Sequence, residues 1–223
     1  MIFLFLLAAI APAFAIKEER KVAHFTELEV SSAFKVFLTQ GSEEKLLIDA
    51  SEVDLKEVIT EVKDNKLIIR LTPTNFSRQI GNISVFLTFT TLTDIDVSGA
   101  VELKGSNEMR FNELEIEGSG ASIINLNISA KKLECELSGA SSATLIGQTD
   151  YFNIDISGAS KLNAMEVLAK TCKLKVSGAS SAKVNVKDTL RIDGSGASEV
   201  LYSGNPNVVE TELSGASKVK KAN

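Results

Sequence analysis

The sequence predicts an all-β protein wound as a parallel β-solenoid, and two observations carry this prediction. The tripeptide Ser-Gly-Ala occurs seven times in residues 98–216, at intervals of 21, 19, 19, 20, 18 and 19 residues. A near-constant period of about 20 residues is typical of solenoids, in which each repeat packs only on its neighbours. The residues before each tripeptide alternate between apolar and charged, which indicates a half-buried strand and not a helix.

Each repeat can be numbered from the serine of its tripeptide, and the apolar positions then fall at −5, −3, −1 and +5. Because the coils of a parallel solenoid stack at about 4.8 Å, side chains with the same number should lie directly over one another. We expect coils of about 19 residues, right-handed as is common for such folds, with a single internal file of side chains at position −3. The members of that file are Ile95, Ile116, Cys135, Ile154, Leu174, Ile192 and Thr211.

The repeated tripeptide is itself predicted to form the tight corner between two strands of a coil. Glycine accepts backbone angles that a Cβ atom would forbid, and serine and alanine are small enough to stack at a bend. A row of catalytic serines is not expected, because the only histidine, His24, lies outside the repeats and no other base is near. We predict a structural role and no catalytic residue for the corner pairs Ser98 and Gly99, Ser119 and Gly120, Ser138 and Gly139, Ser157 and Gly158, Ser177 and Gly178, Ser195 and Gly196, and Ser214 and Gly215.

The same numbering places both cysteines of the chain. Cys135 is at −3 and Cys172 at −5, in coils that are separated by one further coil. The stack alone sets them about 9–10 Å apart, whereas disulfide-bonded Cα atoms lie within about 7 Å of each other. We therefore predict two buried free thiols that pack as small apolar side chains, although exported proteins often form disulfides.

The first fifteen residues predict that the protein is exported. They are apolar throughout and end in Ala13-Phe14-Ala15, which is typical of a signal peptide and its cleavage site. The segment is too short to span a bilayer, which takes about 20 apolar residues, and we expect no transmembrane segment in the mature chain. The formal net charge of −5 argues against a nucleic-acid partner.

Residues 16–91 are predicted to form a β-rich cap on the solenoid of residues 92–223. The stretch FTELEVSSA (25–33) matches LTDIDVSGA (92–100) at its apolar and charged positions, with Ser32 in place of glycine, and is predicted to be a degenerate first coil. Four further strands are expected over 34–40, 45–50, 66–71 and 83–89, with a turn at Gly41-Ser42. A cap is needed because the unpaired edge of a solenoid end would recruit other chains.

Residues 51–71 leave two interpretations open. A short helical turn is expected at Ser51–Lys56, with Ser51 as its N-cap. The stretch ITEVKDNKLIIRL (59–71) alternates on both sides of Lys63-Asp64-Asn65, which favours a β-hairpin. A helix over 52–62 is the alternative, and the β-branched residues favour the hairpin.

Two outward positions of the repeats carry carboxylates. Position −2 is acidic in six of seven coils, and position −4 is acidic in the first three. Carboxylate oxygens are ligands for hard divalent cations, but like charges about 4.8 Å apart in water repel by only about 1 kcal/mol. A solvated face is therefore the favoured interpretation, and a weak cation-binding surface the alternative. Its candidate residues are Asp94, Asp96, Glu115, Glu117, Glu134, Glu136 and Asp155.

The order of these features resembles a bacterial family, the putative auto-transporter adhesins with a head GIN domain. The similar features are the signal peptide, the F-x-x-L-x-V opening, VFLTQGSEEKLLIDAS, V-x-D-N-K-L-I-I and the serial SGAS units. The resemblance implies an all-β protein that is secreted or resides in the cell envelope, at the periplasm or outer surface. It implies no catalytic residue and no cofactor.

These observations favour a non-enzymatic adhesin that presents a long, mostly acidic surface to an unidentified glycan, matrix or protein ligand. A periplasmic or envelope scaffold is the alternative. A polysaccharide-active enzyme stands third, since solenoid lyases and hydrolases exist. It would need clustered carboxylates beside a base in a cleft, for which Asp155, Lys173 and Lys175 are the nearest candidates. The sequence indicates no ligand identity and no oligomeric state.

Overall fold

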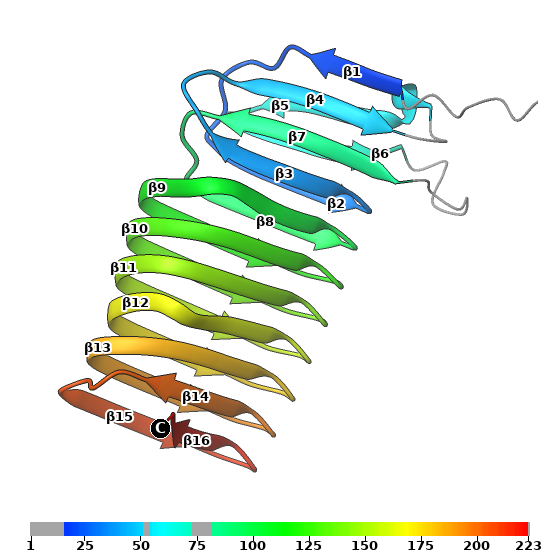
Figure 1. The fold of residues 1–223 in the computed structure, drawn as a ribbon. Coiled ribbons are helices and arrows are strands. Elements are labelled where there is room, and N and C mark those ends of the chain that lie inside the picture. The colour runs from blue at the N-terminus through cyan, green and yellow to red at the C-terminus, as the bar shows by residue number, and fades with distance from the viewer. Residues whose placement is uncertain (1–15, 51–53, 73–81, 223) are drawn as a thin grey trace, which may run out of the picture.

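The computed structural model describes residues 16–50, 54–72 and 82–222. Their strands join into one sixteen-stranded sheet that winds into an elongated parallel β-solenoid of about seven turns (Figure 1). The fold class predicted from the repeats is therefore confirmed. The expected signal peptide, residues 1–15, lies outside the described residues, and no helix within them is long and apolar enough to cross a membrane.

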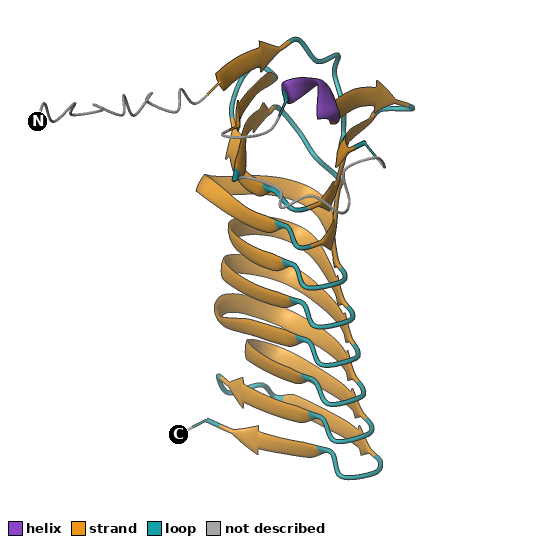
Figure 2. Cartoon of the chain, turned by 90° about the vertical axis from the view of Figure 1, so that its right-hand side faces the viewer, coloured by secondary structure: helices purple, strands orange, loops and turns teal. Residues whose placement is uncertain are grey.

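Most coils are formed by a single long strand that bends and contributes to two faces. The strands of the repeat region are β8 (Asp94–Gly99), β9 (Glu102–Gly118), β10 (Ile123–Leu137), β11 (Ser142–Ile156), β12 (Lys161–Val176), β13 (Ser181–Gly194), β14 (Glu199–Ser203), β15 (Val208–Leu213) and β16 (Lys218–Lys221). We call the face after each Ser-Gly-Ala corner face A, and the face before it face B. Figure 2 shows the corners as a row along one side of the stack.

The register of the strands confirms the internal file predicted at position −3. Ile95 pairs with Ile116, Ile116 with Cys135, and the series continues one residue per coil through Ile154, Leu174, Ile192 and Thr211. The first six side chains are 0–4% exposed. In the last described coil Thr211 is exposed, because no other coil of the described residues covers it.

The corners stack through their backbones, as their composition predicts. All seven predicted corner glycines have φ between +69° and +82°, a region that residues with a Cβ avoid. A Cβ added to Gly158 would lie only 2.5 Å from the Gly139 oxygen of the coil before it. The second serine of the phrase turns inward, and in three coils its hydroxyl bonds the local backbone, as where Ser141 Oγ donates to Ser138 O at 2.7 Å.

Both cysteines lie where the register places them. Cys135 and Cys172 are completely buried and unbonded, which confirms the two free thiols. Cys135 pairs with Ile154, and Cys172 pairs with Phe152 of the same intervening coil. Burial raises the pKa of each thiol to about 12.

The predicted first coil stacks in register on the regular array. Strand β2 (Glu27–Ser32) pairs in parallel with β8, and β3 (Lys35–Gln40) pairs in parallel with β9. Ser32 pairs with Gly99 and takes the same left-handed backbone, with φ +98°. The stack thus passes through residue 92 without a break, and the division into a cap and a solenoid remains our proposal for the domain organisation.

At the N-terminal end, two further strands extend the parallel stack, and antiparallel strands then close it. Strands β6 (Lys66–Leu71) and β7 (Ile83–Phe89) stack in parallel on β2 and β3. Strands β5 (Val58–Lys63) and β4 (Lys45–Ala50) then pair antiparallel to β6 and β7, and β1 (Ile16–Arg20) pairs antiparallel to β4. All four strands predicted beyond the first coil are present.

The hairpin interpretation of residues 59–71 is confirmed, and the helix over 52–62 is wrong. Asp64 and Asn65 both have positive φ, +50° and +64°, as a two-residue hairpin turn requires. The expected helical turn is a 3-10 turn, η1 (Leu55–Glu57), capped by Asp54, whose carboxylate accepts a hydrogen bond from Lys56 N. The proposed cap Ser51 lies outside the described residues.

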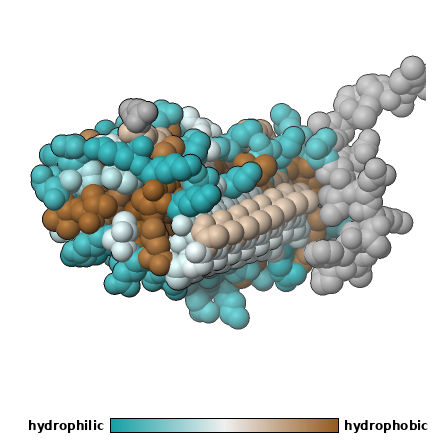
Figure 3. All heavy atoms as spheres, turned by 90° about the horizontal axis from the view of Figure 1, so that it is seen from below, coloured by the Kyte–Doolittle hydropathy of each residue, from teal (hydrophilic) through white to brown (hydrophobic). Residues whose placement is uncertain are grey.

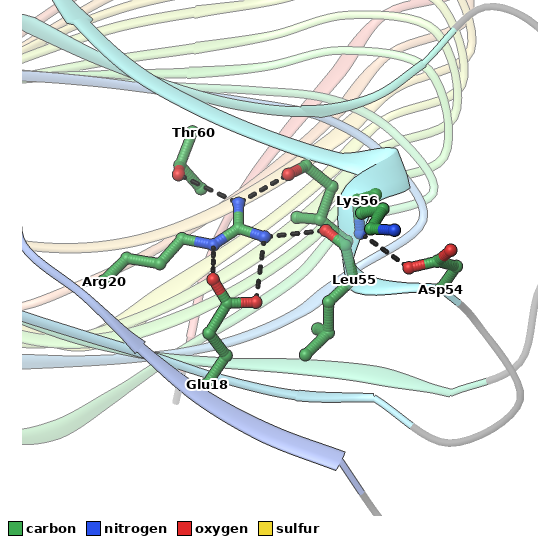
Figure 4. A network of polar contacts seen from close by, with 7 residues as sticks. Glu18, Arg20, Asp54, Leu55, Lys56 and Thr60 are labelled. Carbon is green, nitrogen blue, oxygen red and sulfur yellow. Dashed lines mark hydrogen bonds and ion pairs between the residues drawn. The ribbon is translucent and has the colours of Figure 1, made fainter.

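Arg20 ties the two faces together at the N-terminal end (Figure 4). Its guanidinium donates to Leu55 O at 2.7 Å, to Thr60 Oγ1 at 3.0 Å and to Val58 O, and it pairs with Glu18 at 3.1 Å. Strand β1 lies at the edge of face A, whereas η1 and β5 lie at the edge of face B. The interaction therefore bridges the end of the core.

The corner geometry predicts a large cost for a Cβ at Gly158. We expect Gly158→Ala to lower the free energy of unfolding by about 2 kcal/mol or more, because it combines a left-handed backbone with a backbone contact. The midpoint of urea unfolding, followed by circular dichroism, measures this. The matched control is Ala159→Ser, at an exposed corner position, and equal midpoints for both variants would contradict the stacked corner.

Because both thiols are buried, we expect the folded chain to protect them from thiol-modifying reagents. With a pKa of about 12, on the order of one thiol in ten thousand is ionised at pH 8. A disulfide-exchange reagent should modify neither cysteine in buffer and both in concentrated guanidinium. Rapid modification of the native protein would show that the inward register is wrong.

Candidate functional site

The main charged feature of the solenoid is an unbroken field of carboxylates on the N-terminal half of face B, which we call the acidic surface. It contains all seven residues predicted as candidate cation ligands and two that the sequence analysis did not include. Its members are Glu27, Glu29, Asp94, Asp96, Glu115, Glu117, Glu134, Glu136 and Asp155.

The strand register arranges these residues as two parallel columns. The column at −4 runs Glu27, Asp94, Glu115, Glu134 and then Asn153, and the column at −2 runs Glu29, Asp96, Glu117, Glu136 and Asp155. Glu27 and Glu29 belong to β2, the degenerate first coil. Extending the repeat numbering to FTELEVSSA would have assigned both residues to these columns.

Partial burial makes some of these carboxylates harder to ionise. Burial raises the pKa of Asp94 and Asp96 above their ordinary values, although Lys66 opposes the shift in both. Burial also raises the pKa of Glu117, and the carboxylates of Asp96 and Asp94 add to the effect. The acidic surface therefore carries unfavourable electrostatic energy at neutral pH.

Basic residues border the acidic surface and offset part of its charge. Lys132 Nζ lies 2.6 Å from Glu134, and this hydrogen bond lowers the pKa of the Glu134 carboxyl. Lys66 pairs with Glu27 at 3.3 Å, and Lys175 with Asp155 at 3.3 Å. Further along face B the −4 column becomes basic, because Asn153 pairs with Lys173 and Lys173 with Arg191. The −2 column carries Lys175 and then returns to acid at Asp193.

The acidic surface contains two open grooves. A groove of about 370 Å³ follows the −4 column, and one of about 290 Å³ lies between the −2 column and the corner serines. Across the described ranges, no three histidine, cysteine or carboxylate side chains converge as a metal site would require. Cation binding by this surface stays a prediction, with a solvated face as the favoured interpretation.

The fold brings together only two of the three residues that were candidates for a polysaccharide-active enzyme. Asp155 and Lys175 form an ion pair in which both side chains are about half exposed, whereas Lys173 lies in the other column beside Asn153. General acid–base chemistry on a sugar needs a pair of carboxyl groups that flank the scissile bond. The arrangement here matches an ordinary exposed ion pair.

A third groove, which we call the bend groove, lies where the long strands turn from face A to face B. It has a volume of about 420 Å³, and its lining combines basic with apolar side chains, including Arg110, Phe111, Lys131, Leu168, Lys170 and Lys187. Lys170 pairs with Asp150 at 2.6 Å. The sequence analysis missed this groove, although Lys131 and Lys170 share repeat position −7.

The register, filled core and stacked corners define the class of the protein: it is a parallel β-solenoid with an antiparallel N-terminal closure. The chain belongs to the family described as putative auto-transporter adhesin, head GIN domain, whose model matches residues 24–206. The resemblance noted in the sequence is thus confirmed.

Solved structures share this fold at low identity. A putative adhesin from Bacteroides fragilis superposes with a TM-score of 0.87 at 20% identity, over 94% of this chain and 97% of that one. A putative adhesin from Parabacteroides distasonis gives 0.74 at 18% identity, over 95% and 98% of the two chains. A putative lipid binding protein from the same organism gives 0.72 at 16% identity, over 95% and 98%. No protein with a curated function matches the chain.

The pKa shifts predict opposite effects for two glutamates of adjacent columns. Because the pKa of Glu117 is raised in the folded state, its contribution to stability is present at pH below about 4.3 and is lost as the pH rises through the raised value. For Glu134 the pKa is lowered, so its contribution is present above about 4.3 and is lost as the pH falls through the lowered value.

We therefore expect Glu117→Gln to stabilise the protein by about 0.5 kcal/mol at pH 7, and Glu134→Gln to destabilise it by about the same amount. Both differences should shrink at pH 4. Urea unfolding at the two pH values measures them. A loss of stability from Glu117→Gln at pH 7 would contradict the crowded carboxylates described here.

Proposed function

We propose that the mature chain is an exported, non-enzymatic binding protein that contacts a glycan, matrix or protein ligand at the cell surface. The observation that carries this proposal is the filled, in-register core, which leaves two extended faces with only modest grooves for contact. Extended faces suit recognition of a large partner, since such interfaces bury surface over many residues. The family description as adhesins supports the same conclusion.

Charge is distributed unevenly along the solenoid, which supports an electrostatic contribution to binding. Residues 1–160 contain 23 acidic and 14 basic residues, a net charge of −9, whereas residues 161–223 contain 6 acidic and 10 basic residues, a net charge of +4. Opposite charges on the two ends would orient an approaching charged partner. Binding should therefore weaken as the salt concentration rises.

The proposal assigns recognition to one of two surfaces with opposite charge. The acidic surface suits a cationic partner, and the bend groove, whose lining includes four basic side chains, suits an anionic glycan. A catalytic role has less support, because Asp155 and Lys175 are paired on an open face.

Glycan arrays and pull-downs with the mature chain test the proposal. We compare the wild type with a triple variant of the acidic surface (Asp96→Asn, Glu117→Gln, Glu136→Gln) and one of the bend groove (Lys131→Gln, Lys170→Gln, Lys187→Gln). One variant should lose at least tenfold in affinity while the other keeps its ligand. Calcium and chelator arms show whether the acidic surface acts through a cation.

Location and activity assays separate this proposal from its alternatives. On intact cells, antibody labelling and added protease should reach the protein, whereas a periplasmic scaffold would be protected. Release of soluble products from acidic or neutral polysaccharides by the purified chain would overturn the non-enzymatic assignment.

A further inference from the structure

The two ends of the described solenoid are finished in different ways. At the N-terminal end, β1 and β5 run antiparallel along the edges, and Arg20 bridges them through Leu55, Val58 and Thr60. Inward side chains of the antiparallel strands β4 and β5 are buried: Ile48 is 0% exposed and Val58 2%. At the opposite end the last strands are β15 and β16, and in the described chain no strand covers them (Figure 1).

The open end exposes apolar side chains at positions that are buried in the inner coils. Val209 of β15 is 42% exposed, whereas Leu190, its register partner one coil earlier, is 0% exposed. Leu213, in the column that includes the buried Val97, Leu137, Ile156 and Val176, is 46% exposed. Figure 3 shows hydrophobic surface at this end of the molecule, beyond the regular ladder of small corner residues. An edge strand with an exposed apolar face is a template for further strand pairing.

At this end of the solenoid, one edge strand carries acidic side chains and the other carries basic side chains. Outward positions of β15 carry Glu210 and Glu212, and those of β16 carry Lys218 and Lys220. Glu212 pairs in register with Asp193, so two acids are neighbours there. Glu210 pairs with Arg191 at 2.8 Å and Lys220 with Glu199 at 3.1 Å, one coil earlier. Glu212 and Lys218 form no ion pair within the described residues, so these two charges could each gain a counter-charge from the opposite edge strand of a second copy.

We propose that this end is a dimer interface and that its partner is a second copy of the same chain, docked end to end. The two copies are related by a two-fold axis that runs parallel to the strands and passes through the last corner. This axis places β15 of one copy beside β16 of the other, and the paired strands are antiparallel. Because of the symmetry, the same pairing forms at both edges of the interface. The interface is isologous and closes on itself, so it yields a dimer and no fibre. The N-terminal closures then point outward at the two ends.

Chain geometry sets the register of this pairing. Residues 212 and 218 lie equally far from Gly215, at the centre of the corner, and the axis relates the corners of the two copies. Glu212 then faces the partner's Lys218, and Glu210 faces the partner's Lys220. Among the inward positions, Thr211 faces the partner's Val219, so the apolar core continues across the interface.

Charge excludes the other two-fold arrangement. An axis perpendicular to the sheets would pair β15 with its own copy and β16 with its own copy. Glu210 and Glu212 would then oppose glutamates, and the lysines of β16 would oppose lysines. Like charges directly opposite each other on paired strands are destabilising. Only the arrangement of β15 against β16 gives opposite charges at both edges.

Sedimentation of the mature chain in the absence of any ligand tests the inference independently of the proposed function. We expect a dimer at micromolar concentration. Glu212→Lys and Lys218→Glu should each weaken the dimer at least tenfold, and the double variant should restore it, because the charges are exchanged across each edge. The matched control is Lys183→Glu, on an exposed position of an inner coil, which should leave the dimer unchanged.

Circular dichroism checks that every variant keeps its strand content. Under oxidising conditions the variant T211C/V219C should form a covalent dimer, since these positions face each other in the proposed register. A wild-type monomer at 100-fold higher concentration would overturn the inference and leave this end to a different protein. A dimer that neither the charge swap nor the cross-link affects would equally overturn it.

Discussion

The structure depends on one constraint, the in-register stacking of coils through parallel backbone hydrogen bonds. Each coil places its side chains directly over those of the coil before it. The residue at each position must therefore pack against the residues at the equivalent positions of the neighbouring coils. Apolar residues satisfy this easily, because stacked side chains bury one another. At the corners of the seven regular repeats glycine satisfies it, since a Cβ added to Gly158 would lie only 2.5 Å from the Gly139 oxygen.

The same constraint creates the acidic surface. On a flat sheet open to water, a column of carboxylates costs little energy per pair, and solvent and bordering lysines absorb most of it. The cost becomes noticeable where the columns are partly buried, at Asp94, Asp96 and Glu117. Because these columns point outward, the charge of each coil is independent of the apolar residues that fill the core.

A stacked fold also has two ends, and its unpaired edges are its weak points. At the N-terminal end the chain reverses direction twice, and strands β4 and β5 cover the parallel edges in antiparallel orientation. Arg20 then joins the two faces with several hydrogen bonds from one planar group, which a lysine could not provide. The C-terminal end has no corresponding element within the described chain, so its core side chains remain partly exposed.

The sequence alone determined the solenoid, the inward columns, the corner glycines and the free state of Cys135 and Cys172, because each follows from a period that is visible in one chain. It also indicated the strands and the hairpin of the N-terminal part. Only the tertiary structure decided how those strands pair: β7 lies between β3 and β4, although β3 and β4 are neighbours in sequence. It likewise decided the Arg20 bridge, the bend groove and the exposed last coil. These features join residues that no repeat relates, and contacts between distant segments depend on how the whole chain packs.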